Sequence, residues 1–447
     1  MRICIVGTGY VGLVTGTCLA EIGHDVVCVD DDREKVGVLQ AGGMPIYEPG
    51  LDELVAKNRR HDRLAFTADL RQGLEAATAV FICVGTPPLD DGDADLSAVE
   101  QVARRIGEFS SSYKLVVEKS TVPVQTGMWI EKTLRVYGNG ETIAFDVASN
   151  PEFLREGSAV EDFLHPDRIV VGVGSLRAER LLREIYDPIV RRTFSCPIHS
   201  DCATGGPIPF LVTDIRSAEL IKHASNSFLA AKISFINTVA DLCERVGADV
   251  ELVAQGMGLD RRIGRDFLRA GLGFGGFCFP KDLQAFVRIA EKCGHDFRLL
   301  REVDRINQAR IPHAVGKLKD QLWILKDKVI GVWGLAFKPD TDDIRYSPAI
   351  ALVRQLLAEG AAVKAFDPKA MKKARLELPD VTYCDNPYEA VSGADALVLT
   401  TEWKEFESVD LTRVKDLMRR ALVLDGRNLF DREKIRSMGF EYLGFGR

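Results

Sequence analysis

The sequence predicts an α/β protein: two Rossmann-like α/β domains joined by a long central helix and a helical connector domain. Short apolar segments alternate with amphipathic ones in the first third of the chain, and the same alternation returns in the last third. A long helical pattern free of glycine and proline separates the two. Because 447 residues suffice for two or three domains, we expect domains at 1–205, 206–314 and 315–447.

The first third carries apolar runs typical of strands buried on both faces of a parallel sheet. The expected strands are Ile3–Val6, Val26–Asp30, Ala79–Val84, Leu115–Glu118, Val147–Ser149 and Arg168–Gly172, with helices such as Gly12–Ile22 and Leu96–Phe109 between them. From Asp214 to Val246 the pattern predicts one helix about 45 Å long. Such a helix can bridge two domains or pair with a copy of itself.

A second helical region is expected around Pro280–Ala314, and α/β character then resumes. The expected strands there are Lys328–Gly331, Ala362–Phe366, Ala396–Leu399 and Ala421–Leu424. The first of them leads into a G-x-x-G turn of its own.

Composition excludes several classes of function. The formal net charge is −7 and no basic run is present, which argues against nucleic-acid or anionic-membrane partners. The chain opens directly on a strand, and no apolar stretch approaches the roughly 20 residues that a membrane helix needs. We therefore expect a cytoplasmic protein.

Ten cysteines are present, most of them inside apolar runs, and no pair has the C-x-x-C spacing of a metal or redox site. Buried free thiols are expected, with no metal site. Cys196 and Cys202 flank a loop-like stretch and could form a disulfide.

Gly7, Gly9 and Gly12 form a G-x-G-x-x-G turn between a strand and a helix. Glycines there permit the tight turn, the close approach of a pyrophosphate and the packing of helix against strand. Asp30 ends the next strand, where its carboxylate can bind a ribose diol. Because two further aspartates follow it, NAD⁺ is favoured over NADP⁺.

A second unusual stretch is a glycine-rich run that leads from Gly271 to Cys278 and on to Asp282. A thiol near a helix N-terminus and a lysine is biased toward the reactive thiolate. The alternative is a small buried hydrophobe in a glycine-rich turn.

Lys222 and Asn226 lie four residues apart, on one face of the expected long helix. They interrupt an apolar stripe, and a buried lysine is costly without a partner or a role. The alternative places Lys222 on a solvated edge.

Seven ordered motifs then coincide with a known family. They are GTGYVG (7–12), VGTPP (84–88), EKSTVPVQT (118–126), NPEFLREGSAVEDFLHPDR (150–168), SAELIKHASNSF (217–228), FGGFCFPKD (274–282) and GLAFKPDTDDIRYSP (334–348). On these motifs the chain resembles the UDP-glucose/GDP-mannose dehydrogenase family along essentially its whole length.

The resemblance implies two hydride transfers to two NAD⁺, which convert a CH₂OH group into a carboxylate through a thioester on Cys278. Lys222 and Asn226 would stabilise the oxyanion. Asp282, Thr121 and Glu152 would position water and move protons, although Asp282 and Glu152 could equally be structural acids in salt bridges.

The resemblance also implies the binding residues. For NAD⁺ they are Gly7, Gly9, Val11, Gly12, Asp30, Lys35, Thr86, Thr121, Glu156, Lys281 and Arg345. For the nucleotide sugar they are Glu152, Phe153, Leu154, Arg155, Glu156, Lys222, Asn226, Phe267, Leu268, Arg269, Ala270, Gly271, Gly275, Lys338 and Arg427. Arg262 would reach the substrate from a neighbouring subunit, which implies a homodimer built on the long helix.

Within the family, the segments SAVEDFLHPDR and FGGFCFPKD favour UDP-glucose over GDP-mannose as the substrate. Two other functions stay open: a dehydrogenase that stops after one two-electron oxidation, and a non-catalytic NAD-binding sensor. The stretch Ser195–Pro207 departs from the family pattern, being longer and richer in cysteine and glycine, and is expected to be a surface loop.

Overall fold

The computed structural model describes residues 1–138, 144–199 and 206–447. By its contacts the chain divides into two units, Met1–Ser225 and Asn226–Arg447. The boundary falls inside the long helix α9 (Ile215–Val246), which confirms the helix predicted from Asp214 to Val246. The three-domain division stays a prediction.

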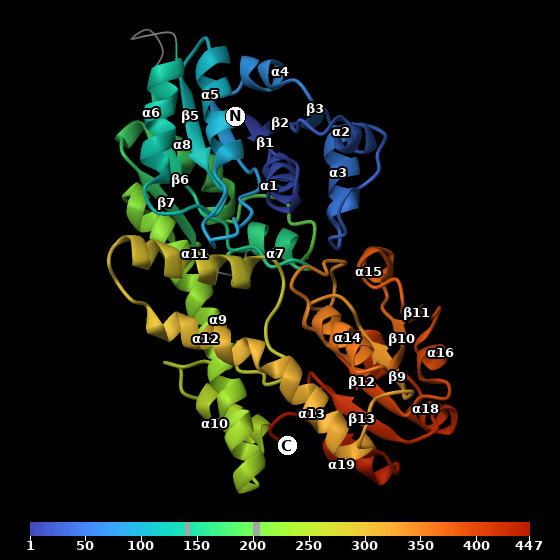
Figure 1. Ribbon diagram of the computed structural model, residues 1–447. Helices are drawn as coiled ribbons and strands as arrows, with labels where there is room; N and C mark the ends of the chain where they lie inside the picture. Colours follow the sequence, from blue (N-terminus) through green and yellow to red (C-terminus); the bar gives the residue numbers. More distant parts are fainter. Residues whose placement is uncertain (139–143, 200–205) are drawn as a thin grey trace. The chain divides into compact units, whose positions relative to one another are not determined.

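Unit 1 is built on an eight-stranded sheet of order β3-β2-β1-β4-β5-β6-β7-β8 (Figure 1). The strands are β1 (Arg2–Val6), β2 (Asp25–Val29), β3 (Leu64–Thr67), β4 (Ala79–Ile82), β5 (Lys114–Glu118), β6 (Phe145–Ser149), β7 (Ile169–Val173) and β8 (Phe210–Thr213). Among the strand pairs that the structure describes in this sheet, only β6–β7 is antiparallel. The order 3-2-1-4-5-6 of the first six strands is that of a dinucleotide-binding fold, whose ligands bind where the order reverses, next to β1 and β4.

Helices cover both faces of this sheet because its strands carry apolar side chains on both faces, as β1 does. Ile3 and Ile5 join the cluster under α1, α3, α7 and α8, whereas Cys4 and Val6 join the one under α4, α5 and α6. The helices are α1 (Tyr10–Glu21), α2 (Arg33–Gln40), α3 (Leu51–Arg60), α4 (Leu70–Glu75), α5 (Ser97–Phe109), α6 (Thr126–Tyr137), α7 (Ala159–Leu164) and α8 (Leu176–Val190).

Unit 2 repeats the topology with a fully parallel six-stranded sheet of order β11-β10-β9-β12-β13-β14. The strands are β9 (Val329–Trp333), β10 (Ala362–Phe366), β11 (Thr382–Tyr383), β12 (Ala396–Leu399), β13 (Leu422–Asp425) and β14 (Glu441–Leu443). The sheet helices are α14 (Pro348–Ala358), α15 (Met371–Glu377), α16 (Pro387–Val391), α17 (Lys404–Glu407), α18 (Leu411–Leu417) and α19 (Arg432–Ser437). The expected pair of Rossmann-like sheets is confirmed.

The rest of unit 2 is helical and packs on the second part of α9. It comprises α10 (Val250–Gly258), α11 (Cys278–Lys292), α12 (Arg298–Gln308) and α13 (Arg310–Leu322). Ile236 and Ala240 of α9 contact α10, and Ala230 lies against α11 and α12. The helical region expected at Pro280–Ala314 is therefore three helices; α11 ends before Gly294, whose φ is +75°.

No helix among the described residues combines the length and hydropathy needed to cross a bilayer. Cys202 lies outside the described residues, so the alternative of a disulfide between Cys196 and Cys202 is not tested. No disulfide joins two of the nine cysteines that the structure describes.

Candidate active site

The glycine turn of unit 1 joins β1 to α1. Gly7 has a φ of +100°, and a Cβ added to Gly12 would lie 1.9 Å from the Gly7 carbonyl oxygen. Gly9 differs, because a Cβ there would meet no described atom within 4 Å. The geometry of the turn therefore requires glycine at positions 7 and 12. At Gly9 the space beside the backbone is open, and it lies at the start of α1, where N–H groups favour a phosphate.

Asp30 follows β2 and is buried. Its carboxylate accepts hydrogen bonds from the Thr8 backbone N–H (2.7 Å) and hydroxyl (2.8 Å), and Lys35 Nζ lies 3.1 Å away. Burial alone would raise the pKa of Asp30, but these contacts and the Asp32 N–H outweigh it and lower the pKa. The residue predicted to bind ribose is therefore a charged acceptor, already oriented by the glycine turn.

The predicted threonines also lie at the carboxyl ends of strands. Thr86 follows β4, is buried, and donates its hydroxyl hydrogen bond to the Thr121 carbonyl oxygen at 2.8 Å. Thr121 follows β5. Since Gly7, Asp30 and these threonines all follow the carboxyl ends of parallel strands, the sheet gathers them along one edge.

Lys222 of α9 is buried with Glu152, which follows β6. The Lys222 Nζ lies 2.8 Å from the Glu152 carboxylate, and both side chains are about 5% exposed or less. The second Glu152 oxygen accepts the Leu154 N–H at 2.6 Å. The alternative that places Lys222 on a solvated edge is wrong, because the lysine satisfies its burial with a buried partner.

Lys119 is a buried cation that the sequence analysis did not single out. Its Nζ donates to the Asn150 side-chain oxygen at 3.1 Å. Burial is the largest cause that lowers its pKa, to about 8; the charge of Lys222 lowers it further, and Cys83 and Glu152 oppose the shift. A lysine two residues after the apolar run Leu115–Val117 of β5 was the available signal.

The remaining residues predicted in the 152–156 segment vary in exposure. Phe153 lies near two cations, with the Arg168 guanidinium 3.8 Å and Lys222 Nζ 5.5 Å from its ring centre. Arg155 is exposed and pairs with Asp162. Glu156 and Val11 are half-buried.

In unit 2, Cys278 is the first residue of α11 and is half-buried. Asp282 lies one turn further on, where its carboxylate contacts Lys281 Nζ at 2.7 Å and accepts a hydrogen bond from Asn226 Nδ2 at 2.6 Å. Lys281, Asp282 and Asn226 are all buried. A thiol at a helix N-terminus with a buried lysine three residues away fits the environment expected of a reactive thiolate.

The glycines before this thiol contact the protein's own backbone and rings. A Cβ on Gly271 would lie 2.3 Å from the Gly426 carbonyl oxygen, and one on Gly275 would lie 2.4 Å from that of Tyr346. A Cβ on Gly276 would lie 2.7 Å from the Phe337 ring. The glycines were expected to let the backbone approach a ligand closely. At these positions they instead let one segment of unit 2 approach another.

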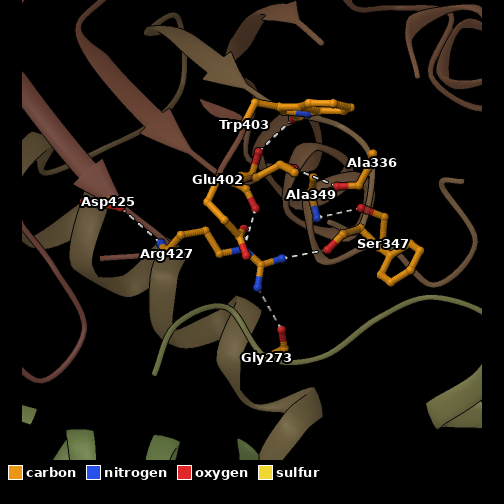
Figure 2. Close-up of polar contacts among 12 residues, drawn as sticks. Gly273, Ala336, Ser347, Ala349, Glu402, Trp403, Asp425 and Arg427 are labelled. Atoms are coloured by element: carbon orange, nitrogen blue, oxygen red, sulfur yellow. Dashed lines mark hydrogen bonds and ion pairs between the residues drawn. The ribbon is translucent and has the colours of Figure 1, made fainter. Parts of the chain in front are cut away.

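Arg427 is held by unit 2 itself. It donates to the carbonyl oxygens of Thr400 (2.8 Å), Phe337 (2.9 Å) and Gly273 (3.3 Å), and pairs with Glu402 at 3.2 Å. Figure 2 shows the guanidinium directed toward Gly273 and Glu402. In this arrangement Arg427 fastens the glycine-rich run to the sheet; its predicted contact with substrate stays a prediction.

The other predicted residues of unit 2 are dispersed. Leu268 and Ala270 belong to the core cluster with α9, whereas Arg262 is 88% exposed and pairs with Asp260. Arg345 pairs with Asp343 and stacks 4.5 Å from the Phe277 ring centre. Phe267 and Lys338 are half-buried and Arg269 is exposed.

Comparison with known proteins extends over the whole chain. Models of the UDP-glucose/GDP-mannose dehydrogenase family match residues 1–190 (NAD binding domain), 216–309 (central domain) and 331–432 (UDP binding domain). The UDP-glucose 6-dehydrogenase TuaD of Bacillus subtilis is 45% identical over 447 residues, which cover 100% of this chain and 93% of the relative. A UDP-glucose 6-dehydrogenase of Rhizobium meliloti is 46% identical and is covered completely, as is this chain.

The structure of a UDP-glucose dehydrogenase from Pyrobaculum islandicum matches with a TM-score of 0.89 and 41% identity, covering 99% of this chain and 97% of that one. The fold and the NAD-binding domain expected from the sequence are thereby confirmed. The chain belongs to the UDP-glucose/GDP-mannose dehydrogenase family.

Proposed function

We propose that this protein oxidises UDP-glucose to UDP-glucuronate in two NAD⁺-dependent steps, through a thiohemiacetal and a thioester on Cys278. The observation that carries the proposal is the placement of Cys278 at the N-terminus of α11, one turn before a buried Lys281–Asp282 pair. Relatives at 45% and 46% identity act, by name, on UDP-glucose.

NAD⁺ supplies the hydride acceptor for both oxidations. Gly9 and the start of α1 fit a pyrophosphate, and the Asp30 carboxylate fits a ribose. We assign Lys35, Thr86, Thr121, Glu156, Lys281 and Arg345 to the same cofactor on the family resemblance.

The first oxidation removes a hydride and a proton from the CH₂OH group and leaves an aldehyde. The Cys278 sulfur then bonds to the aldehyde carbon, and its proton is transferred so that a thiohemiacetal with a hydroxyl group forms. The second oxidation removes the hydride from that carbon and the hydroxyl proton, which gives the thioester. Water attacks the thioester carbon, the C–S bond breaks, and the carboxylate and the thiol are released.

Lys222 and Asn226 are proposed to stabilise the negative oxygen that develops at each addition step. Both are side chains of α9, one turn apart, and both are held by acids: Lys222 by Glu152 and Asn226 by Asp282. Donors fixed before the reaction need little reorganisation, which is how an oxyanion site lowers a barrier.

Glu152 and Asp282 are proposed to move protons, with Thr121 positioning water. Each acid uses its two carboxylate oxygens for different contacts. One Glu152 oxygen contacts Lys222 and the other accepts the Leu154 N–H. One Asp282 oxygen accepts from Asn226 and the other contacts Lys281. In the alternative, Glu152 and Asp282 are structural acids that form salt bridges and take no part in proton transfer. A pH–rate profile of Asp282→Asn separates the two, since loss of a general base removes an ionisation from kcat.

The decisive experiment measures NADH formed per nucleotide sugar consumed, with UDP-glucose and GDP-mannose offered separately. We expect two NADH per UDP-glucose and no turnover of GDP-mannose. Two NADH per GDP-mannose would keep the chemistry and overturn the substrate, and one NADH per sugar would make the protein a two-electron dehydrogenase. Absence of turnover with a panel of nucleotide sugars would favour a sensor.

Cys278→Ser tests the thioester directly, and Cys293→Ser is its matched control because Cys293 is an exposed cysteine at the end of α11. We expect the first variant to lose carboxylate formation by at least a thousandfold, about 4 kcal/mol in barrier, and the second to match the unchanged protein. Equal carboxylate production by Cys278→Ser would end the mechanism.

A homodimer is the proposed assembly. Phe228, Phe235 and Leu242 of α9 are 66%, 53% and 58% exposed and recur every seven residues. An exposed apolar stripe at this spacing is typical of a helix that packs along another helix. A second copy of α9 offers the same stripe, and in such a dimer Arg262 would serve the neighbouring subunit.

A cytoplasmic location stays a proposal. It is supported by the nine described cysteines, no two of which form a disulfide with each other, as fits a reducing compartment.

A further inference from the structure

The end of α7 and the segment after α8 bring two histidines and a cysteine together in unit 1. His165 Nε2 lies 3.1 Å from Cys196 Sγ, and His199 Nδ1 lies 3.9 Å from the same sulfur. Within the described part of the chain, this is the one group of three such side chains whose ligand atoms all lie within 4.8 Å of one another. No role in the proposed oxidation uses them.

These distances suit a tetrahedral metal ion. With a Zn–S bond near 2.3 Å and a Zn–N bond near 2.0–2.1 Å, a sulfur and a nitrogen ligand of one ion are separated by about 3.5 Å. The observed separations of 3.1 and 3.9 Å lie on either side of this value.

The surroundings of Cys196 and His199 support metal binding independently. The backbone N–H groups of Ile198 and His199 donate to Cys196 Sγ at 3.3 and 3.2 Å, which stabilises a negatively charged sulfur. The other ring nitrogen of His199 faces the Glu161 carboxylate at 3.7 Å. A carboxylate behind a histidine is the usual outer partner of a metal-bound imidazole.

We propose that His165, Cys196 and His199 bind one divalent ion of the zinc class. Two imidazoles and a thiolate form a donor set of intermediate softness, which selects zinc-like ions over magnesium or calcium. Binding displaces the thiol proton of Cys196. The ion fastens the connection that follows α8 to the end of α7, so its role is structural.

No metal site was expected from the sequence, because no two cysteines have the C-x-x-C spacing. The three ligands are a C-x-x-H pair and a histidine 31 residues earlier, and only the fold places them together. The pair lies in Ser195–Pro207, the stretch that departs from the family pattern.

The test uses the full-length protein, stripped with a chelator under reducing conditions and titrated with Zn²⁺ or Co²⁺. Bound zinc is counted by mass spectrometry after desalting, and cobalt is followed by its thiolate charge-transfer and d–d absorption. Cys196→Ser and Cys278→Ser form a matched pair, because the second removes a thiol outside the cluster. Glu161→Gln tests the outer partner.

We expect one zinc per chain and a four-coordinate cobalt spectrum in the unchanged protein and in Cys278→Ser, and neither in Cys196→Ser. Glu161→Gln should weaken the affinity by about tenfold or more. A hundredfold excess of zinc over its Kd should raise the Tm of the unchanged protein by about 5–10 °C, without an equal shift in Cys196→Ser. Retention of the site by Cys196→Ser, recovery of Cys196 in a disulfide, or no zinc after desalting would each overturn the proposal.

Discussion

Glu118 and Glu219 form a buried pair of carboxyl groups in unit 1, and their titration opposes folding at neutral pH. Glu118 ends β5, and its side chain is fully buried. Burial is the largest cause that raises its pKa well above the usual value, and the charge of Glu219 raises it further. The pKa of Glu219 is also raised by burial, although the N–H groups of Gly127 and Gln125 oppose the shift.

The sign of the effect follows from proton binding. In the unfolded chain Glu118 ionises near pH 4.3, whereas the folded protein keeps the proton to a higher pH. Between the two pKa values folding takes up a proton, so the free energy of unfolding falls by about 1.4 kcal/mol for each unit of rising pH. Glu118→Gln is neutral at every pH and removes this slope.

The free energy of unfolding should be measured by urea titration from about pH 5 to pH 8, with hydrogen exchange of β5 peptides to assign the transition to unit 1. We expect Glu118→Gln to lose less stability than the unchanged protein as the pH rises. Glu108→Gln, an exposed acid on α5, is the control and should run parallel to the unchanged protein. Parallel curves for Glu118→Gln would refute the reasoning.

Three further predictions concern the turn, the buried pair and the assembly. Gly12→Ala should abolish NAD⁺ binding in calorimetry, since its Cβ would lie 1.9 Å from a carbonyl oxygen, whereas Gly37→Ala, whose Cβ meets no described atom within 4 Å, should bind normally. Lys222→Met should lower the free energy of unfolding in urea by about 3 kcal/mol, because it leaves Glu152 buried without the Lys222 cation. Adding Glu152→Gln should restore much of that free energy. An unchanged urea midpoint for Lys222→Met would contradict this. Phe235→Glu should halve the mass seen by light scattering, and an unchanged mass would argue against pairing through α9.

The strands inside each sheet were predictable, and the edge strands were not. β1, β4 and β12 appear within a residue or two of their expected bounds because each is buried on both faces. Four strands were not predicted, each of four residues or fewer and each at an edge of its sheet: β3, β8, β11 and β14. Edge strands are less buried, so their local composition carries a weaker signal.

Pairing across long separations was the part of the site that local patterns could not supply. The spacing of Lys222 and Asn226 indicates one helix face, but their acids stand 70 and 56 residues away. Glu152 and Asp282 were predicted only from the family resemblance. The structure adds their contacts with Lys222 and Asn226, which allow these two polar side chains to be buried. Lys119 was overlooked because a single lysine at the end of a strand resembles an ordinary edge charge.

The glycine-rich run before Cys278 shows how one pattern can have a physical cause other than the expected one. Glycine was expected there so that the backbone could approach a ligand, yet Gly271 and Gly275 are required by carbonyl groups of unit 2 itself. Arg427 donates to the carbonyl of Gly273 within the same run. These contacts fix the path of the chain immediately before α11 and therefore fix the position of the thiol. For the nucleophile proposed here, a rigid approach of the chain would serve catalysis through positioning, and such a role requires no direct contact between those glycines and the substrate.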